Sequence, residues 1–101
     1  RVEVTEIDRF GNVALTLGLE QLCLPDSREL RLVVEETDEQ EWRGYVVRTF
    51  SDLKPGELGI LQDSWGHASL ALNGASAAEL LGARLGSVVR ISREFGTERA
   101  G

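Results

Sequence analysis

The feature that most constrains the fold of this chain is a series of short segments in which apolar and polar residues alternate. In residues 1–7, Val2 and Val4 are apolar, whereas Glu3 and Glu6 are polar. A period of two is typical of a β-strand with one face in water. Six further strand-like segments follow, at residues 13–17, 28–36, 41–49, 58–62, 68–72 and 88–93.

Turn-forming residues separate these segments. We expect bends at residues 8–12 and 63–67, where Asp, Gly and Asn or Ser gather. Residues 54–57 place Pro and Gly at the two central positions that a type II turn prefers. A loop at residues 18–25 and a solvated acidic turn at residues 35–39 complete the connections.

One short helix is expected before the last strand. Ser76 and Glu79 have the spacing of a helix capping box, and Gly82 is a typical helix stop. The helix therefore occupies residues 75–82. Together these elements predict a mostly β protein, a small antiparallel β-barrel of about seven strands with one short helix. Closure is favoured because it removes exposed sheet edges.

Composition limits the partners of such a barrel. The 101 residues suffice for one domain, with the barrel at 1–93 and a polar tail at 94–101 that we expect to fray. The net charge of −6 disfavours nucleic-acid binding, which needs clustered cations. The sequence contains neither a signal segment nor a membrane-spanning apolar run, so we expect a cytoplasmic protein with no membrane partner. An N-terminal Arg1 and the absence of any Met indicate a fragment of a longer gene product.

No familiar catalytic motif is present. The chain lacks a spaced Ser/His/Asp set, a Gly-rich phosphate loop and a CxxC pair. We predict no catalytic residue, no metal site and no cofactor. His67 is expected to be a solvated turn residue and Cys23 a small buried hydrophobe. Trp42 and Tyr45 are expected to pack in the core or across the sheet.

Several motifs nevertheless occur in a fixed order between residues 2 and 91. They are Ile7-Asp8-Arg9-Phe10-Gly11-Asn12, Thr49-Phe50-Ser51-Asp52 with Pro55-Gly56-Glu57, Asp63-Ser64-x-Gly66, Leu70-Ala71-Leu72-Asn73-Gly74 with Ser76-Ala77-Ala78, and Leu81-Gly82 with Gly86-x-x-Val89. In this order they resemble the C-terminal domain of the S-adenosylmethionine hydroxide adenosyltransferases, relatives of the fluorinases and chlorinases. A lone Phe-Gly-Asn is a weak signal, whereas the ordered set is specific.

The resemblance implies a parent enzyme that hydrolyses S-adenosylmethionine to adenosine and L-methionine without a metal or redox cofactor. The site would lie between this domain and the N-terminal domain of a neighbouring subunit in a homotrimer. By this resemblance Asp8 would hold the substrate ammonium, and Phe10 and Phe50 would flank the adenine ring. Asn12 would bind the adenine edge, because an amide both donates and accepts.

The resemblance gives further roles to two later segments. Ser64 would bond the methionine carboxylate, and the backbone at Asn73, Gly74 and Ala75 would contact the base. Two positions depart from the family. Asp63 replaces a frequent Asn and would repel the substrate carboxylate unless it points away. Trp65 replaces the Arg of the halogenating branch, which disfavours halide chemistry.

A different class of function remains open. The chain would then be a stand-alone interaction barrel that binds a protein partner through one face and has no catalytic role. An oligonucleotide-binding barrel is disfavoured by the acidic charge and by the lack of a stripe of aromatic and basic residues. By the resemblance, the groups that activate water lie in the N-terminal domain, so the isolated chain is expected to be inactive.

Overall fold

A computed structural model of the chain describes residues 1–18, 21, 29–35 and 40–93. The predicted tail at 94–101 and Cys23 lie outside these residues. The elements are β1 (Val2–Ile7), β2 (Val13–Leu15), β3 (Glu29–Val34), β4 (Glu41–Val46), the 3-10 helix η2 (Phe50–Asp52), β5 (Leu58–Gln62), β6 (Ala68–Leu72), α1 (Ala77–Leu81) and β7 (Val88–Arg93).

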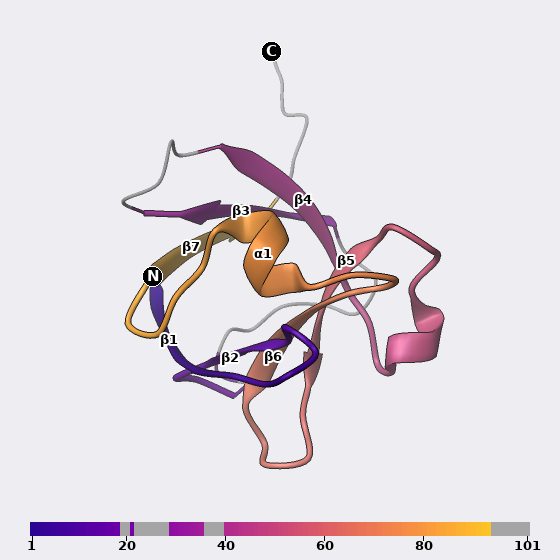
Figure 1. Cartoon of the computed structure of the whole chain (residues 1–101), viewed down its shortest axis with the longest axis horizontal. Helices are drawn as coiled ribbons and strands as arrows, with labels where there is room; N and C mark the ends of the chain where they lie inside the picture. Colours follow the sequence, from indigo (N-terminus) through magenta and orange to yellow (C-terminus); the bar gives the residue numbers. More distant parts are fainter. Residues whose placement is uncertain (19–20, 22–28, 36–39, 94–101) are drawn as a thin grey trace.

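The strands close into a barrel in the order β1-β2-β6-β5-β4-β3-β7, and β7 returns to pair with β1 (Figure 1). The predicted seven-stranded, mostly β barrel with one short α-helix is thereby confirmed. The pairs are antiparallel except for β4 and β5, which run parallel with Tyr45 opposite Gly59. Antiparallel pairing throughout was the expectation from sequence. Residues 47–57, which we call the crossover, explain the difference, because parallel neighbours need a connection that carries the chain back before the second strand begins.

Alternation along the strands produces a barrel with an apolar interior. Val13 and Leu15 of β2, Ile60 of β5 and Leu70 of β6 are fully buried in the main core. The residues between them face the outside of the barrel, because neighbouring side chains on a strand point to opposite faces. On β2, β5 and β6 these outward residues are Ala14, Leu61, Ser69 and Ala71.

The helix α1 covers the core from one end of the barrel. Ser76 Oγ accepts a hydrogen bond from Glu79 N at 3.1 Å, and Gly82 ends the helix in the left-handed region with φ 69°. Ala77, Ala78 and Leu81 are buried in the main core. Figure 1 shows α1 within the ring of strands, and the helix predicted over residues 75–82 is confirmed.

The crossover packs on the outside of the barrel through a second, smaller apolar cluster. This cluster consists of Val47, Leu53 and Ala71, with Tyr45 and Leu61 packed against it. Gly59 makes room for it, because a Cβ there would lie 2.6 Å from Leu53 Cδ2. The packing of Leu53 thus fixes η2, whose first residue, Phe50, stays 45% exposed. Trp42 packs against the main core, so the packing roles predicted for Trp42 and Tyr45 are confirmed.

Of the remaining connections predicted from sequence, the turn at residues 54–57 is confirmed. Residues 54–57 form the predicted turn, in which Glu57 N donates to Lys54 O at 2.9 Å and Gly56 has φ 84°. The predicted loop at 18–25 and the acidic turn at 35–39 lie mostly outside the described residues. Over the described ranges, no helix has the length and apolar character needed to cross a membrane.

Candidate functional site

The bend between β1 and β2 is organised by one carboxylate. Asp8 Oδ1 accepts hydrogen bonds from Phe10 N and Asn12 N, each at 2.9 Å. Asp8 N donates to Asn12 O, and Gly11 N donates to Asp8 O, both at 3.0 Å. Gly11 adopts φ 86°, a value that favours glycine. The ring of Phe10 is left 68% exposed. We call residues 8–12 the first turn.

The bend between β5 and β6, residues 63–67, repeats this geometry, and we call it the second turn. Asp63 Oδ1 accepts from Trp65 N and His67 N, each at 2.9 Å. Asp63 N donates to His67 O at 2.8 Å, and Gly66 N donates to Asp63 O at 3.1 Å, with φ 88° at Gly66. Trp65 stands where the first turn has Phe10 and is 81% exposed. Both bends are the predicted turns, and His67 is exposed as expected.

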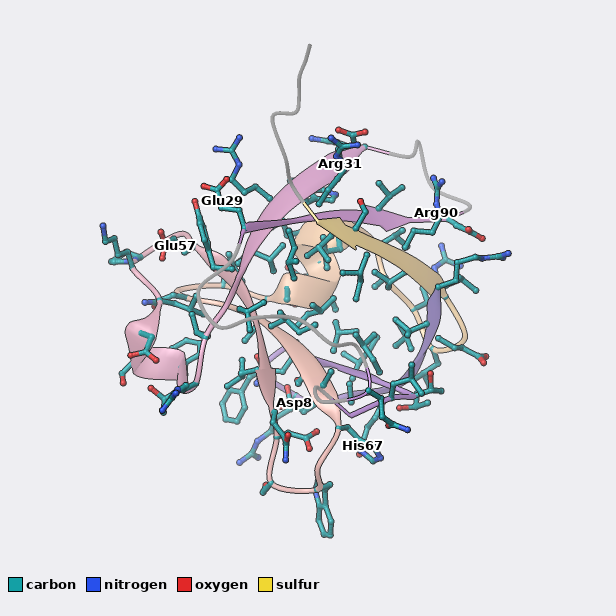
Figure 2. The ribbon with its side chains drawn as sticks, turned by 180° about the vertical axis from the view of Figure 1, so that it is seen from behind. Asp8, Glu29, Arg31, Glu57, His67 and Arg90 are labelled. Carbon is teal, nitrogen blue, oxygen red and sulfur yellow. The ribbon has the colours of Figure 1, made fainter. Side chains whose placement is uncertain are left out.

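The two turns border one cavity of about 370 Å³ on the outside of the barrel. They stand at the two ends of the short strand β2, since Asn12 precedes Val13 and Ala68 N donates to Leu17 O at 2.8 Å. Figure 2 shows Asp8 close to the β5–β6 hairpin. The walls of the cavity are Asp8, Asn12, Phe50, Asp63, Ser64 and Trp65, and its floor consists of Glu6, Ala14, Leu61, Ser69 and Ala71.

A second hollow of about 460 Å³ adjoins the first. Asn12 and Phe50 line both hollows, so the two are neighbours that share these side chains as walls. The second hollow is lined by Phe10, Asn12, Phe50, Leu72, Gly74, Ala75 and Ser76. The structure therefore brings together all but one of the site residues predicted from sequence.

Asn73 is the predicted residue that lines neither hollow. Its Nδ2 donates to Leu53 O at 2.7 Å, its backbone N donates to Glu57 O at 3.0 Å, and its O accepts from Gly56 N at 2.9 Å. These contacts give Asn73 a structural role, because they tie the end of β6 to the crossover that carries Phe50.

The electrostatics of the first turn keep Asp8 ionised. Partial desolvation acts to raise the pKa of Asp8, but the hydrogen bonds from Asn12, Phe10 and Gly11 outweigh it and leave the pKa below its ordinary value. Asn12 Nδ2 also donates to Asp8 Oδ2 at 2.9 Å. This bond orients the amide and leaves Asn12 Oδ1 as an acceptor at the junction of the two hollows.

Sequence reasoning missed the floor of the cavity. Glu6, Ser69 and the two small residues Ala14 and Ala71 lie between the turns on the outer barrel face. A signal was present, because outward strand positions are ordinarily occupied by larger polar residues, whereas β6 reads Ala-Ser-Leu-Ala-Leu. Small side chains there let another molecule approach the barrel closely.

Comparison with known proteins agrees with this arrangement. Over residues 2–90 the sequence matches the family described as the SAM hydroxide adenosyltransferase C-terminal domain. The chain belongs to this family. Two curated relatives are (R)-S-adenosyl-L-methionine hydrolases, from Salinispora tropica (38% identical over 90 residues) and Salinispora arenicola (36% over 91 residues). Each match covers 89% of this chain and 31% of the relative, so the chain spans about a third of their length.

Solved structures share the fold of this chain. A crystal structure of an uncharacterized conserved protein from Thermotoga maritima has a TM-score of 0.84 and 28% identity, covering 91% of this chain and 34% of that protein. A conserved hypothetical protein from Thermus thermophilus has a TM-score of 0.65 and 33% identity, covering 89% of this chain and 34% of that protein. The barrel is therefore one part of larger chains in both cases.

The structure locates Asp63 and Trp65, the two residues near Ser64 that depart from the family pattern. Asp63 is bound through Oδ1 to the amides of its own turn and also lines the cavity. Its carboxylate therefore contributes negative charge to the cavity lining beside Ser64. Trp65 lines the same cavity and brings an indole where the halogenating branch was expected to have a cation.

Proposed function

We propose that this chain is the substrate-binding C-terminal domain of a cytoplasmic S-adenosylmethionine hydrolase. In the reaction, water attacks the ribose C5′, the C5′–sulfonium bond breaks, and adenosine, L-methionine and a proton are released. The names of the two curated relatives support this reaction. The observation that carries the proposal is the convergence of Asp8, Asn12, Phe50 and Ser64 on two neighbouring hollows.

The hollows suggest how the substrate divides between them. The adenine lies in the hollow between Phe10 and Phe50, whose exposed rings offer stacking faces. Asn12 Oδ1 accepts from the exocyclic amine of the base. The ammonium of the methionine part lies near Asp8, which is held ionised and accepts a charge-assisted bond. Ser64 offers its hydroxyl to the methionine carboxylate.

The proposal assigns the other half of the site to a different domain. Both hollows are open at the surface, and Phe10, Phe50 and Trp65 are substantially exposed. Exposed apolar patches of this kind often mark a surface that another domain or subunit covers. We propose that the N-terminal domain of a neighbouring subunit covers them in a homotrimer and supplies the groups that activate water. No metal or redox cofactor takes part.

The test uses a protein that joins this domain to its N-terminal domain. Phe50→Ala is expected to raise KM with little change in melting temperature, because lost stacking costs roughly 1–3 kcal/mol of binding. Asn12→Ala is also expected to raise KM, because it leaves a base atom unpaired at a similar cost in binding free energy. Leu85→Ala, at a residue that is 68% exposed and lines neither hollow, serves as the control. Normal KM with a lower melting temperature in the first two variants would assign them to the core instead.

A second test uses the 101-residue chain alone. It is expected to release no methionine from S-adenosylmethionine and to bind adenosine weakly, because half a pocket leaves much of the ligand in water. Addition of the separately expressed N-terminal domain is expected to tighten binding. Turnover or sub-micromolar adenosine binding by the chain alone would exclude the two-domain site. Tight binding of an unrelated protein, with no response to adenosine, would favour the interaction-barrel alternative.

A further inference from the structure

The cavity between the two turns is acidic. Glu6, Asp8 and Asp63 line it, and its lining, taken over the described residues, includes no Lys, Arg or His side chain. The three carboxylates surround the cavity and do not converge on one point, since no three His, Cys, Asp or Glu side chains of the described chain are placed to hold a metal ion. This spacing suits an organic cation that extends across the cavity.

Cationic side chains of the barrel are engaged elsewhere. Arg31 Nε lies 3.5 Å from Glu41 Oε1, and Arg90 Nε lies 3.4 Å from a carboxylate oxygen of Glu35. Figure 2 shows Arg31 and Arg90 at the opposite end of the molecule from Asp8. Arg9, although it belongs to the first turn, stacks on Phe10 with Cζ 5.3 Å from the ring centroid. These three arginines therefore do not balance the negative charge of the cavity, whose described lining includes no cation.

Ser69 is an independent sign that the floor of the cavity contacts a polar group. It is 8% exposed and is the one buried polar residue of the described chain. Its hydroxyl has no hydrogen-bond partner among the described residues. A buried hydroxyl without a partner destabilises a fold, whereas the adjacent outward residues, Ala14 and Ala71, carry no such group. The hydroxyl is thus available to a ligand atom above the floor.

Two aromatic rings add to the preference for positive charge. Trp65 and Phe50 both line the cavity. The faces of aromatic rings attract cations, and indole does so most strongly. Aromatic rings and carboxylates around one cavity together favour a sulfonium or ammonium group as the ligand.

We propose that this cavity selects its adenosyl ligand by the positive charge of the tail, with the Ser69 hydroxyl as a polar contact on the floor. A carboxylate on the tail is not required, because the hydrogen bond that Ser64 offers to it is opposed by repulsion from Asp63 in the same cavity. An adenosyl sulfonium with an aminopropyl tail keeps both cations of S-adenosylmethionine and lacks its carboxylate, and it therefore binds more tightly. The inference rests on the proposed function, because it assumes that the adenine occupies the adjoining hollow.

The first experiment compares three ligands on the 101-residue chain by amide chemical shifts, which report millimolar binding. The ligands are the aminopropyl adenosyl sulfonium, S-adenosylmethionine and adenosine. Affinity is expected to fall in that order, with about three- to tenfold between the first two, because the aminopropyl compound lacks the carboxylate that the acidic cavity repels. Equal affinity for these two compounds, or tighter binding of S-adenosylmethionine, would overturn the inference.

The same titrations separate this inference from the proposed function. If all three ligands shift the amides of Phe10, Asn12 and Ala75 with equal affinity, the adenosyl site stands and selection by charge is wrong. If none of them shifts these amides at millimolar concentration, even after addition of the separately expressed N-terminal domain, the proposed function is wrong and the inference with it.

Two variants test the residues named. Asp63→Asn retains an Oδ1 that accepts from Trp65 N and His67 N, so the turn is preserved while one charge is removed. It is expected to reduce the preference for the aminopropyl compound about three- to tenfold. Glu41→Gln, which removes one exposed carboxylate on β4, is expected to leave the preference unchanged. An equal effect of the two variants would assign the preference to the overall charge of the protein and overturn the inference.

Ser69→Ala is expected to weaken binding of both sulfonium compounds about three- to tenfold, with adenosine affinity unchanged. Because the variant removes a buried hydroxyl that lacks a partner among the described residues, its melting temperature is expected to stay the same or rise. Unchanged affinity for both sulfonium compounds would remove Ser69 from the proposed site.

Discussion

The first and second turns share four internal hydrogen bonds but differ in what holds them from outside. In the first turn, Gly11 is buried, a Cβ built on it would collide with Ser76 Oγ, and Gly11 O accepts from Ala78 N at 2.9 Å. In the second turn, a Cβ on Gly66 would meet nothing within 4 Å. The Asp-x-aromatic-Gly pattern is therefore sufficient to specify the turn, while tertiary contacts decide how firmly the turn is fixed to the barrel.

The glycines provide the largest expected contrast. Gly11→Ala is expected to lower the free energy of unfolding by about 3–5 kcal/mol, because a positive φ and a collision with the cap of α1 combine. Gly66→Ala is expected to cost about 1–2 kcal/mol, from the positive φ alone. Urea denaturation of both variants measures the difference. Equal losses of unfolding free energy in the two variants would show that α1 can shift to accommodate the added Cβ and does not anchor the first turn.

Removal of the central carboxylates is expected to have a smaller effect. Asp8→Ala loses acceptors for two backbone N–H groups and for Asn12 Nδ2, whereas Asp63→Ala loses acceptors for two backbone N–H groups. We expect losses of about 2 and about 1 kcal/mol, the range measured for capping residues. The Asp→Asn variant of each turn, which keeps an acceptor, is the control. A larger loss of unfolding free energy for Asp63→Ala than for Asp8→Ala would contradict this expectation.

The pH dependence of the first turn follows from the lowered pKa of Asp8. A carboxyl with a lower pKa in the folded state stabilises the fold above its unfolded pKa, and this contribution is lost as pH falls through the folded pKa. The stability advantage of the parent chain over Asp8→Asn is therefore expected to shrink below about pH 4. Denaturation curves at a series of acidic pH values check this, and a constant difference would contradict it.

The exposed rings are expected to have the smallest effect on stability. Phe10→Ala and Trp65→Ala should each change the free energy of unfolding by less than about 0.5 kcal/mol, since exposed side chains contribute little to the fold. Both turns would then present an aromatic ring that the fold does not need. A loss above about 1 kcal/mol at either position would show that the ring packs against the barrel.

The sequence allowed prediction of features that depend on nearby residues. Both turns, the hairpin strands β5 and β6 and the capped helix follow from residues within a few positions of one another. The parallel pair β4–β5 was not predicted, because the crossover that causes it is fixed by the contact of Leu53 with Gly59.

The candidate site shows the same limit. Asp8, Asn12, Phe50 and Ser64 were indicated by the family motifs, and they do line the two hollows. Asn73 belongs to the same motifs, yet its side chain binds Leu53 O, a contact between segments that lie apart in sequence. Ser69 was missed because only the pairing of β6 with β2 and β5 creates the floor around it.

The position of β7 has a consequence for the synthesis of this chain. Among the described strands, β7 is the last to be synthesised, and it pairs with both β1 and β3, so the ring stays open until residues 88–93 are available. Folding that depends on such distant pairings takes milliseconds to seconds. During that time the unpaired edges of β1 and β3 are exposed as templates for strands of other chains. A nascent or truncated chain that ends before β7 is therefore the form of this protein most prone to aggregate.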